Sequence, residues 1–120
     1  MKLAFAAAGK TLSSSLDQRF GRCPGFLVYN TETNETSYTD NSQNLNAAQG
    51  AGIQAATHVV NMGADCVLCG HCGPKAFRTL KAAGIQVICG VEGTIQDLVK
   101  KFEQGALTSA EVPNVEGHWM

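Results

Sequence analysis

Apolar residues occur along the chain in short runs separated by polar turns, and their spacing changes from one run to the next. Continuous or alternating apolar runs are typical of strands, whereas apolar positions three and four residues apart are typical of helices. This pattern predicts strands over 2–7, 26–29, 36–39, 66–69 and 86–89. It predicts helices over 47–62, 74–83 and 95–103, the first with an apolar stripe of Ile53, Ala56, Val59 and Val60.

Turn residues mark the ends of these predicted elements. Thr33-Asn34 indicates a turn between the second and third strands, which would make them an antiparallel hairpin. Gly63 and Gly84 follow two of the helices, and Pro74 suits the first turn of a helix. In the second half, strands alternate with helices, which favours parallel pairing through right-handed crossovers. We therefore predict an α/β fold with a mixed sheet of about five strands covered by helices.

Composition narrows the class of protein. Hydrophobic residues make up 44% of the 120 residues, enough for one domain with a true core, which we place at 1–110, with 111–120 as a flexible tail. The net charge of -1 gives no field for general nucleic-acid binding. No apolar run approaches the length of a transmembrane helix. The chain has five cysteines, an odd number, and we interpret its first apolar run as a strand and not as a signal peptide. Both observations favour free thiols in a reducing cytoplasm.

Three of the cysteines, Cys66, Cys69 and Cys72, have the spacing C-x2-C-x2-C. Thiols spaced in this way often bind soft metals or metal–sulfur clusters. They lie where a predicted strand gives way to a glycine-rich turn and then to a helix. Open α/β sheets bind ligands at such places, and the backbone N–H groups of the helix start favour an anion.

Strand geometry limits which thiols can share a metal. Cys66 and Cys69 would lie ~10 Å apart on one strand, with side chains on opposite faces. We therefore expect Cys66 in the core. Cys69 at the strand tip, Cys72 in the loop and Cys89 at the tip of the next strand are candidate metal ligands. His71 is a further candidate, as a ligand or as a hydrogen-bond donor to cluster sulfur. The alternative is that these cysteines pack as small hydrophobic residues and that His71 is solvated.

Basic residues and a second cysteine-bearing loop suggest a site for an anion. The segment 9–24 is polar, and we expect the loop from Gly9 to Gly25 to be mobile without ligand and to become ordered on binding. Sulfido-metal clusters are usually anionic, so guanidinium groups and a helix amino terminus would suit them. The candidate cluster-binding residues are Arg19, Arg22, Cys23, Gly73 and Lys75.

Four motifs in order resemble the nitrogenase iron-molybdenum cofactor-binding family. They are Arg19–Phe26 with its Phe-Gly-Arg core, the Gly-Ala-Gly start of Gly50–Ala56, the Gly-Pro segment Gly73–Leu80 continued by Ala83–Ile85, and Gly93-Thr94. The resemblance implies a three-layer α/β/α ribonuclease H-like fold and a role as carrier, chaperone or scaffold for metal–sulfur clusters. The family pattern does not demand cysteines within 66–72, so their presence leaves open which cluster is held.

From these observations we expect a non-enzymatic cytoplasmic protein of an anaerobe that binds a molybdenum- or iron-containing metal–sulfur cluster. Its partners would be the cluster and proteins that donate or accept it, and neither nucleic acid nor membrane. Two alternatives remain open. Cys69 and Cys72 form a C-x-x-C pair before a helix, which would suit a small thiol redox enzyme. The chain could also be a regulatory assembly protein without metal.

Overall fold

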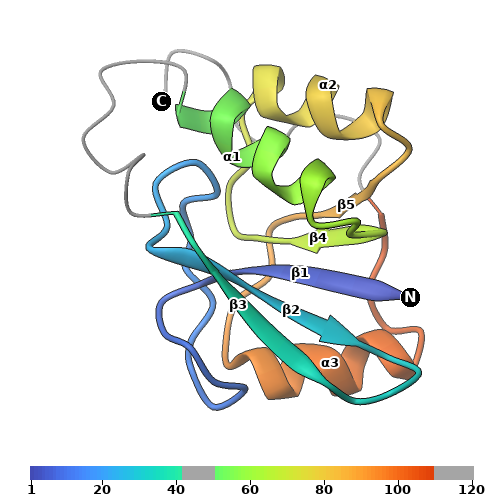
Figure 1. Ribbon diagram of the computed structural model, residues 1–120. Helices are drawn as coiled ribbons and strands as arrows, with labels where there is room; N and C mark the ends of the chain where they lie inside the picture. Colours follow the sequence, from blue (N-terminus) through green and yellow to red (C-terminus); the bar gives the residue numbers. More distant parts are fainter. Residues whose placement is uncertain (42–50, 110–120) are drawn as a thin grey trace.

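The structure is a computed structural model that describes residues 1–41 and 51–109 of the 120-residue chain. Within these residues, five strands form one sheet in the order β3-β2-β1-β4-β5 (Figure 1). The strands are β1 (Lys2–Ala7), β2 (Gly25–Asn30), β3 (Thr36–Asp40), β4 (Cys66–Leu68) and β5 (Gln86–Ile88). The helices are α1 (Ala51–Asn61), α2 (Pro74–Ala82) and α3 (Ile95–Glu103). β1 pairs antiparallel with β2 and parallel with β4, and β5 extends the parallel side.

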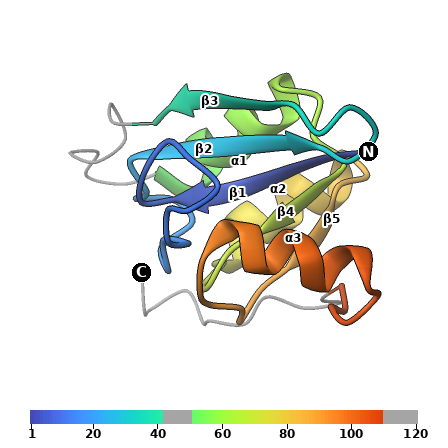
Figure 2. The same ribbon diagram turned by 90° about the horizontal axis from the view of Figure 1, so that it is seen from below.

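Helices cover both faces of the sheet. α1 and α2 lie on one face and α3 lies on the other (Figures 1 and 2). The central strand β1 is buried on both sides: Leu3 and Phe5 belong to the apolar cluster beneath α3, whereas Ala4 and Ala6 belong to the cluster beneath α1 and α2. The predicted α/β fold with a mixed sheet of about five strands and three layers is thus confirmed. The ribonuclease H-like description is compatible with it.

The predicted hairpin is confirmed in detail. β2 and β3 are antiparallel neighbours, and the chain turns between them at Asn34, which has a φ of 61°. The Tyr29 hydroxyl donates a hydrogen bond of 2.6 Å to Asn34 Oδ1 and fixes the turn against β2. Asparagine tolerates this left-handed conformation better than most residues with side chains, which explains its place there.

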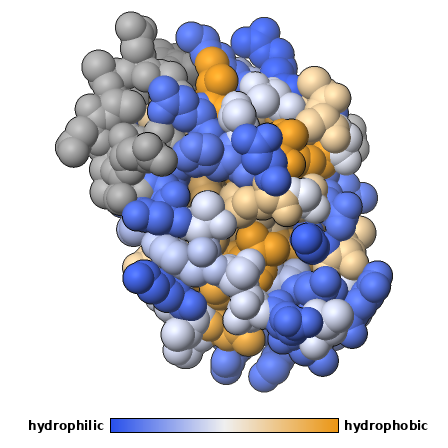
Figure 3. Space-filling view, in the orientation of Figure 1, coloured by the Kyte–Doolittle hydropathy of each residue, from blue (hydrophilic) through white to orange (hydrophobic). Residues whose placement is uncertain are grey.

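The apolar stripe predicted for the first helix is partly wrong. α1 buries Ala51, Ala55, Ala56 and Val59, while Ile53 and Val60 are 41% and 37% exposed. Alanines make up most of the buried face of α1, and a Cβ added at Gly52 would make an ordinary contact with α2, 3.4 Å from the Ala76 Cβ. Ile53 and Val60 face outward, whereas Val59 is buried as predicted. The face of the molecule seen in Figure 3 shows its apolar side chains as separate areas among polar ones.

Two predicted strands end one residue early. β4 stops at Leu68 and β5 at Ile88, so Cys69 and Cys89 are each the first residue beyond a strand. The described helices include none with the length and apolar character needed to cross a membrane. The predicted helix start at 47–50 and the tail 111–120 lie outside the described residues.

Candidate functional site

The candidate site lies where the parallel strands β1, β4 and β5 end. The loops that follow them, 8–24, 69–73 and 89–94, meet at one edge of the sheet, and α2 and α3 begin directly after the last two. In open α/β sheets this edge is where ligands bind, because loops and helix amino ends converge there. Each candidate residue of the sequence analysis comes from these loops or from the first turn of α2.

The loop 8–24, called the early loop below, is tied to its surroundings by backbone hydrogen bonds. Asp17 N donates to Ala6 O (2.7 Å), and His71 N donates to Gln18 O (2.7 Å). Phe20 N donates back to His71 O (3.3 Å), and the Phe20 side chain is buried. Such contacts fix the middle of this loop to β1 and to the loop 69–73, which carries Cys69 and Cys72. The expectation that this loop is mobile without ligand and becomes ordered on binding stays a prediction.

Four of the five cysteines lie on one face of the sheet. Cys23, Cys69 and Cys72 are fully buried in the cluster beneath α1 and α2, and the half-buried Cys89 packs against that cluster. Cys66 is buried in the other cluster, beneath α3. The expectation that Cys66 is a core residue, pointing away from Cys69, is confirmed.

Their surroundings hold the Cys69 and Cys23 thiols in the neutral form. A hydrogen bond with Cys72, reinforced by burial, raises the pKa of Cys69 well above its usual value, and the charges of Cys89 and Cys23 would raise it further. Burial raises the pKa of Cys23 to about 12. A metal that binds Cys69 must therefore displace its proton at a cost. Over residues 1–41 and 51–109, no group of three or more His, Cys, Asp or Glu side chains is arranged to hold a metal ion.

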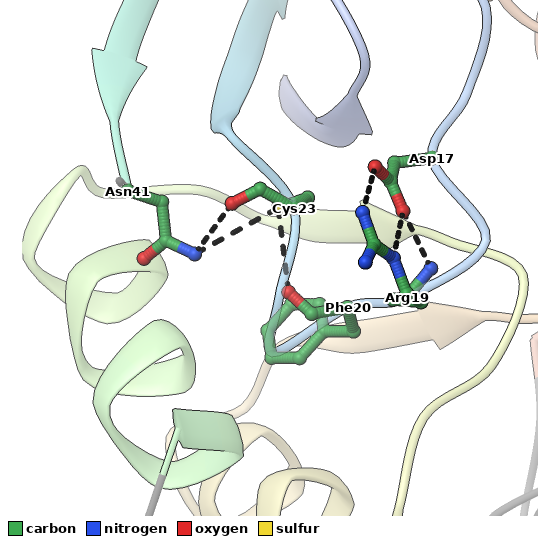
Figure 4. A network of polar contacts seen from close by, with 5 residues as sticks. All are labelled: Asp17, Arg19, Phe20, Cys23 and Asn41. Atoms are coloured by element: carbon green, nitrogen blue, oxygen red, sulfur yellow. Dashed lines mark hydrogen bonds and ion pairs between the residues drawn. The ribbon is translucent and has the colours of Figure 1, made fainter. Parts of the chain in front are cut away.

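Arg19 is bound to an acidic neighbour that the sequence analysis did not pair with it. Its Nε lies 3.2 Å from Asp17 Oδ1, and its Nη2 lies 3.2 Å from Asp17 Oδ2 (Figure 4). Asp17 is the first cause of the raised pKa of Arg19. The charge of Arg19 is therefore largely balanced within the protein. The short spacing of Asp17 and Arg19 in a loop was the signal that could have revealed this pair.

A buried asparagine connects three segments next to the thiols. Asn41 Nδ2 donates a 3.0 Å hydrogen bond to the Cys23 carbonyl oxygen, and the Cys23 thiol donates to the Phe20 oxygen at 3.3 Å (Figure 4). On the other side, the Asn41 Oδ1 lies 3.3 Å from His58 Nδ1 of α1. Asn41 thereby ties the end of β3, the early loop and α1 together. Nothing in the local sequence distinguishes this asparagine from its polar neighbours, so it was missed.

The amino ends of α2 and α3 differ in how their N–H groups are occupied. At α3, the Thr94 hydroxyl accepts from Asp97 N, and Ile95 N donates to Ser14 O. At α2, the cap residue Gly73 offers no side-chain acceptor and the first turn has no acidic residue. Uncompensated N–H groups at a helix start carry partial positive charge and attract anions. α2 is thus the end better suited to an anionic ligand.

The early loop approaches α1 very closely at Gly21. A Cβ placed on Gly21 would lie 2.9 Å from Gly52 N and 3.0 Å from Gly52 Cα, so only glycine fits there. Gly52 is in the first turn of α1, which also has no acidic residue. The contact places the neighbouring Arg22, which is half-buried, beside the start of α1. Lys75 and His71 are exposed at the same edge.

The structure is a small α/β/α domain in which three loops and two helix starts meet at one edge of the sheet. The model of the family described as "Dinitrogenase iron-molybdenum cofactor" matches residues 1–105, and the chain belongs to this family. The chain is similar to the orange protein of Desulfovibrio gigas, solved in its apo form, with 40% identity, coverage of 95% of this chain and 96% of that one, and a TM-score of 0.93.

Two more distant relatives have a similar extent. A putative NifB protein from Thermotoga is 32% identical, with 97% of this chain and 98% of that chain covered and a TM-score of 0.82. An uncharacterised protein of Methanocaldococcus jannaschii is 30% identical over 101 residues, which are 82% of this chain and 86% of the relative. The family expected from the four motifs is thus confirmed.

Proposed function

We propose that this protein binds and carries an anionic metal–sulfur cluster, containing molybdenum or iron, at the edge formed by the early loop and α2. The observation that carries the proposal is the open amino end of α2. It has a glycine cap, no acidic residue in its first turn and Lys75 exposed in that turn. An anion there would be stabilised by N–H groups and by nearby positive charge. Membership of a family described by the iron-molybdenum cofactor supports the same ligand class.

Arg22 is the guanidinium that we assign to the cluster. It follows Gly21, whose close contact with Gly52 fixes the loop on the first turn of α1. Arg19 is expected to contribute less, because Asp17 already balances its charge. Cys23, although in the same loop, is fully buried and is assigned a supporting role in packing beneath the cluster.

Thiol ligation is the second part of the proposal. Cys89 is only half-buried and is the thiol that a cluster at this edge can reach first. Cys69 and Cys72 have no exposed surface, so ligation by them requires the loop 69–73 to open. His71, exposed in that loop, would donate to cluster sulfur or bind its metal. In this picture charge and N–H donors bind the cluster first, and thiolates exchange onto it afterwards.

Titration with tetrathiomolybdate, followed by its visible absorption, tests the anion site. Arg22→Glu is expected to weaken binding by at least about tenfold, because it replaces an attractive charge by a repulsive one. Arg78→Glu is the matched control, with the same charge change at an exposed position of α2. Equal weakening in both variants would mean that only net charge matters. Unchanged binding in Arg22→Glu would remove Arg22 from the site.

A further inference from the structure

The Cys69 and Cys72 thiols are buried together and interact with each other, and the proposed binding of an anion does not require this interaction. The two side chains share a hydrogen bond, although two residues separate them in the chain. Both are fully buried, and the Cys72 Sγ also lies 3.8 Å from the Gly73 carbonyl oxygen. The backbone between them is held to the next loop by a 2.8 Å hydrogen bond from Gly90 N to Gly70 O. The pair is therefore preorganised by the fold.

We propose that Cys69 and Cys72 form a reversible disulfide, and that Cys89 is the thiol through which oxidising equivalents reach them from solvent. Both thiols are buried in the same cluster and lie three positions apart in the chain, so an S–S bond of about 2.05 Å would close only a short loop. A C-x-x-C pair that precedes a helix is the arrangement used by dithiol redox proteins. The proposal does not depend on cluster binding.

Cys89 is suited to the entry role by its position. It follows β5 as Cys69 follows β4, and Cys69 N donates a 3.0 Å hydrogen bond to Ile88 O, next to Cys89 in the chain. β4 and β5 pair in parallel with Leu68 opposite Ile88, so Cys69 and Cys89 are the next two residues in this register. Among these three thiols, Cys89 alone is partly exposed. An oxidant in solution therefore meets Cys89 before it meets the buried pair.

The exchange balances with a small external disulfide such as oxidised glutathione. The Cys89 thiolate attacks one glutathione sulfur, forms a mixed disulfide and releases one molecule of reduced glutathione. Cys69 gives up its proton to the departing glutathione, attacks the Cys89 sulfur and releases the second molecule of reduced glutathione. Cys72 then attacks the Cys69 sulfur, which forms the Cys69–Cys72 bond and frees Cys89. In sum, two thiols lose two protons and two electrons, and oxidised glutathione gains them. A reducing dithiol reverses the sequence.

Peptide mapping of the full chain tests the proposal. The metal-free protein, kept with a chelator, is incubated with oxidised glutathione, unfolded in urea that contains iodoacetamide, and cleaved before Asp65 and after Lys75. The resulting peptide contains Cys66, Cys69 and Cys72 and no other cysteine. We expect it to carry one label, on Cys66, and an internal bond between the other two. Treatment with dithiothreitol should then give three labels. A peptide that remains triply labelled, or a bond that uses Cys66, would overturn the disulfide.

The entry role has its own control. Cys89→Ser is expected to form the same product at least about tenfold more slowly, because the exposed thiol that meets the oxidant is gone. Cys66→Ser, a buried thiol on the opposite face, should react at the wild-type rate. An unchanged rate in Cys89→Ser would overturn the entry route. Because no cluster is present, failure here is distinct from failure of tetrathiomolybdate binding.

Discussion

The Asp17 carboxylate holds Arg19 by three hydrogen bonds, one to its backbone N–H at 2.8 Å and two to its guanidinium at 3.2 Å. The Arg19 side chain is 63% exposed and the Asp17 side chain only 10%, so Asp17 is the more firmly packed member of the pair. A positive charge at the candidate site is thus matched by a negative one supplied from two residues away. The proposed anion site carries less net charge than its sequence suggests.

Asp17→Asn is expected to strengthen the binding of tetrathiomolybdate, because it removes the negative charge that balances Arg19. Asparagine keeps an oxygen that can accept the Arg19 N–H, so the local backbone should persist. At a partly exposed site the gain should be about 1 kcal/mol, or roughly fivefold in affinity. Asp65→Asn, at the opposite edge of the sheet, is the control. If both variants bind equally tightly, the local pair has no influence on the ligand.

Cys66→Ser should lower the stability of the protein without changing its metal content, whereas Cys69→Ser and Cys72→Ser should lower its metal content. Cys66→Ser buries a hydroxyl in place of a thiol beneath α3 and should cost about 1–3 kcal/mol of unfolding free energy. Its metal content after anaerobic loading should remain that of the wild type. Cys69→Ser and Cys72→Ser should each lose soft metal or cluster. Bound metal and urea unfolding are measured for all three. Metal loss in Cys66→Ser at unchanged stability would contradict the placement of Cys66 away from the site.

Alkaline pH should destabilise the protein through its buried thiols. Burial, with a smaller effect of Asp65, raises the pKa of Cys66 from 9.0 to about 12 in the folded state. The unfolded chain therefore releases this proton first, and stability falls as pH rises from about 9 toward 12. By pH 10 the Cys66 thiol should account for a loss of about 1.4 kcal/mol. Urea unfolding of wild type and Cys66→Ala at pH 8 and pH 10 isolates it, since their difference should shrink by that amount. A constant difference would exclude this titration.

Gly21→Ala should disturb the seating of the early loop on α1. The added Cβ would lie 2.9 Å from a backbone nitrogen that cannot move aside cheaply, so a loss of about 1–3 kcal/mol is expected. Tetrathiomolybdate affinity should fall as well, because Arg22 follows directly. Gly52→Ala is the matched control. Its Cβ would make an ordinary 3.4 Å contact, and alanine favours the helix. Similar effects of the two substitutions would show that the close approach at Gly21 is not special.

The sequence alone determined the order and type of the elements. Short apolar or alternating runs predicted each strand, and the turn at Thr33-Asn34 predicted the hairpin, because these signals are local. Strand alternation also assigned Cys66 and Cys69 to opposite faces of the sheet, because successive side chains along a strand alternate with a period of two. The four motifs indicated the family, and the match over residues 1–105 confirmed it.

Only the tertiary structure decided which residues of the site act together. The local spacing of Ile53 and Val60 suggested that they belong to a buried stripe, but the packing of α1 leaves both exposed and buries three alanines and Val59. The pairing of β4 with β5 set Cys89 beside Cys69, and the path of the loop set Asn41 between Cys23 and His58. These contacts join residues that are distant in the chain. Their register depends on how the sheet and helices pack, and short-range patterns of polarity do not encode it.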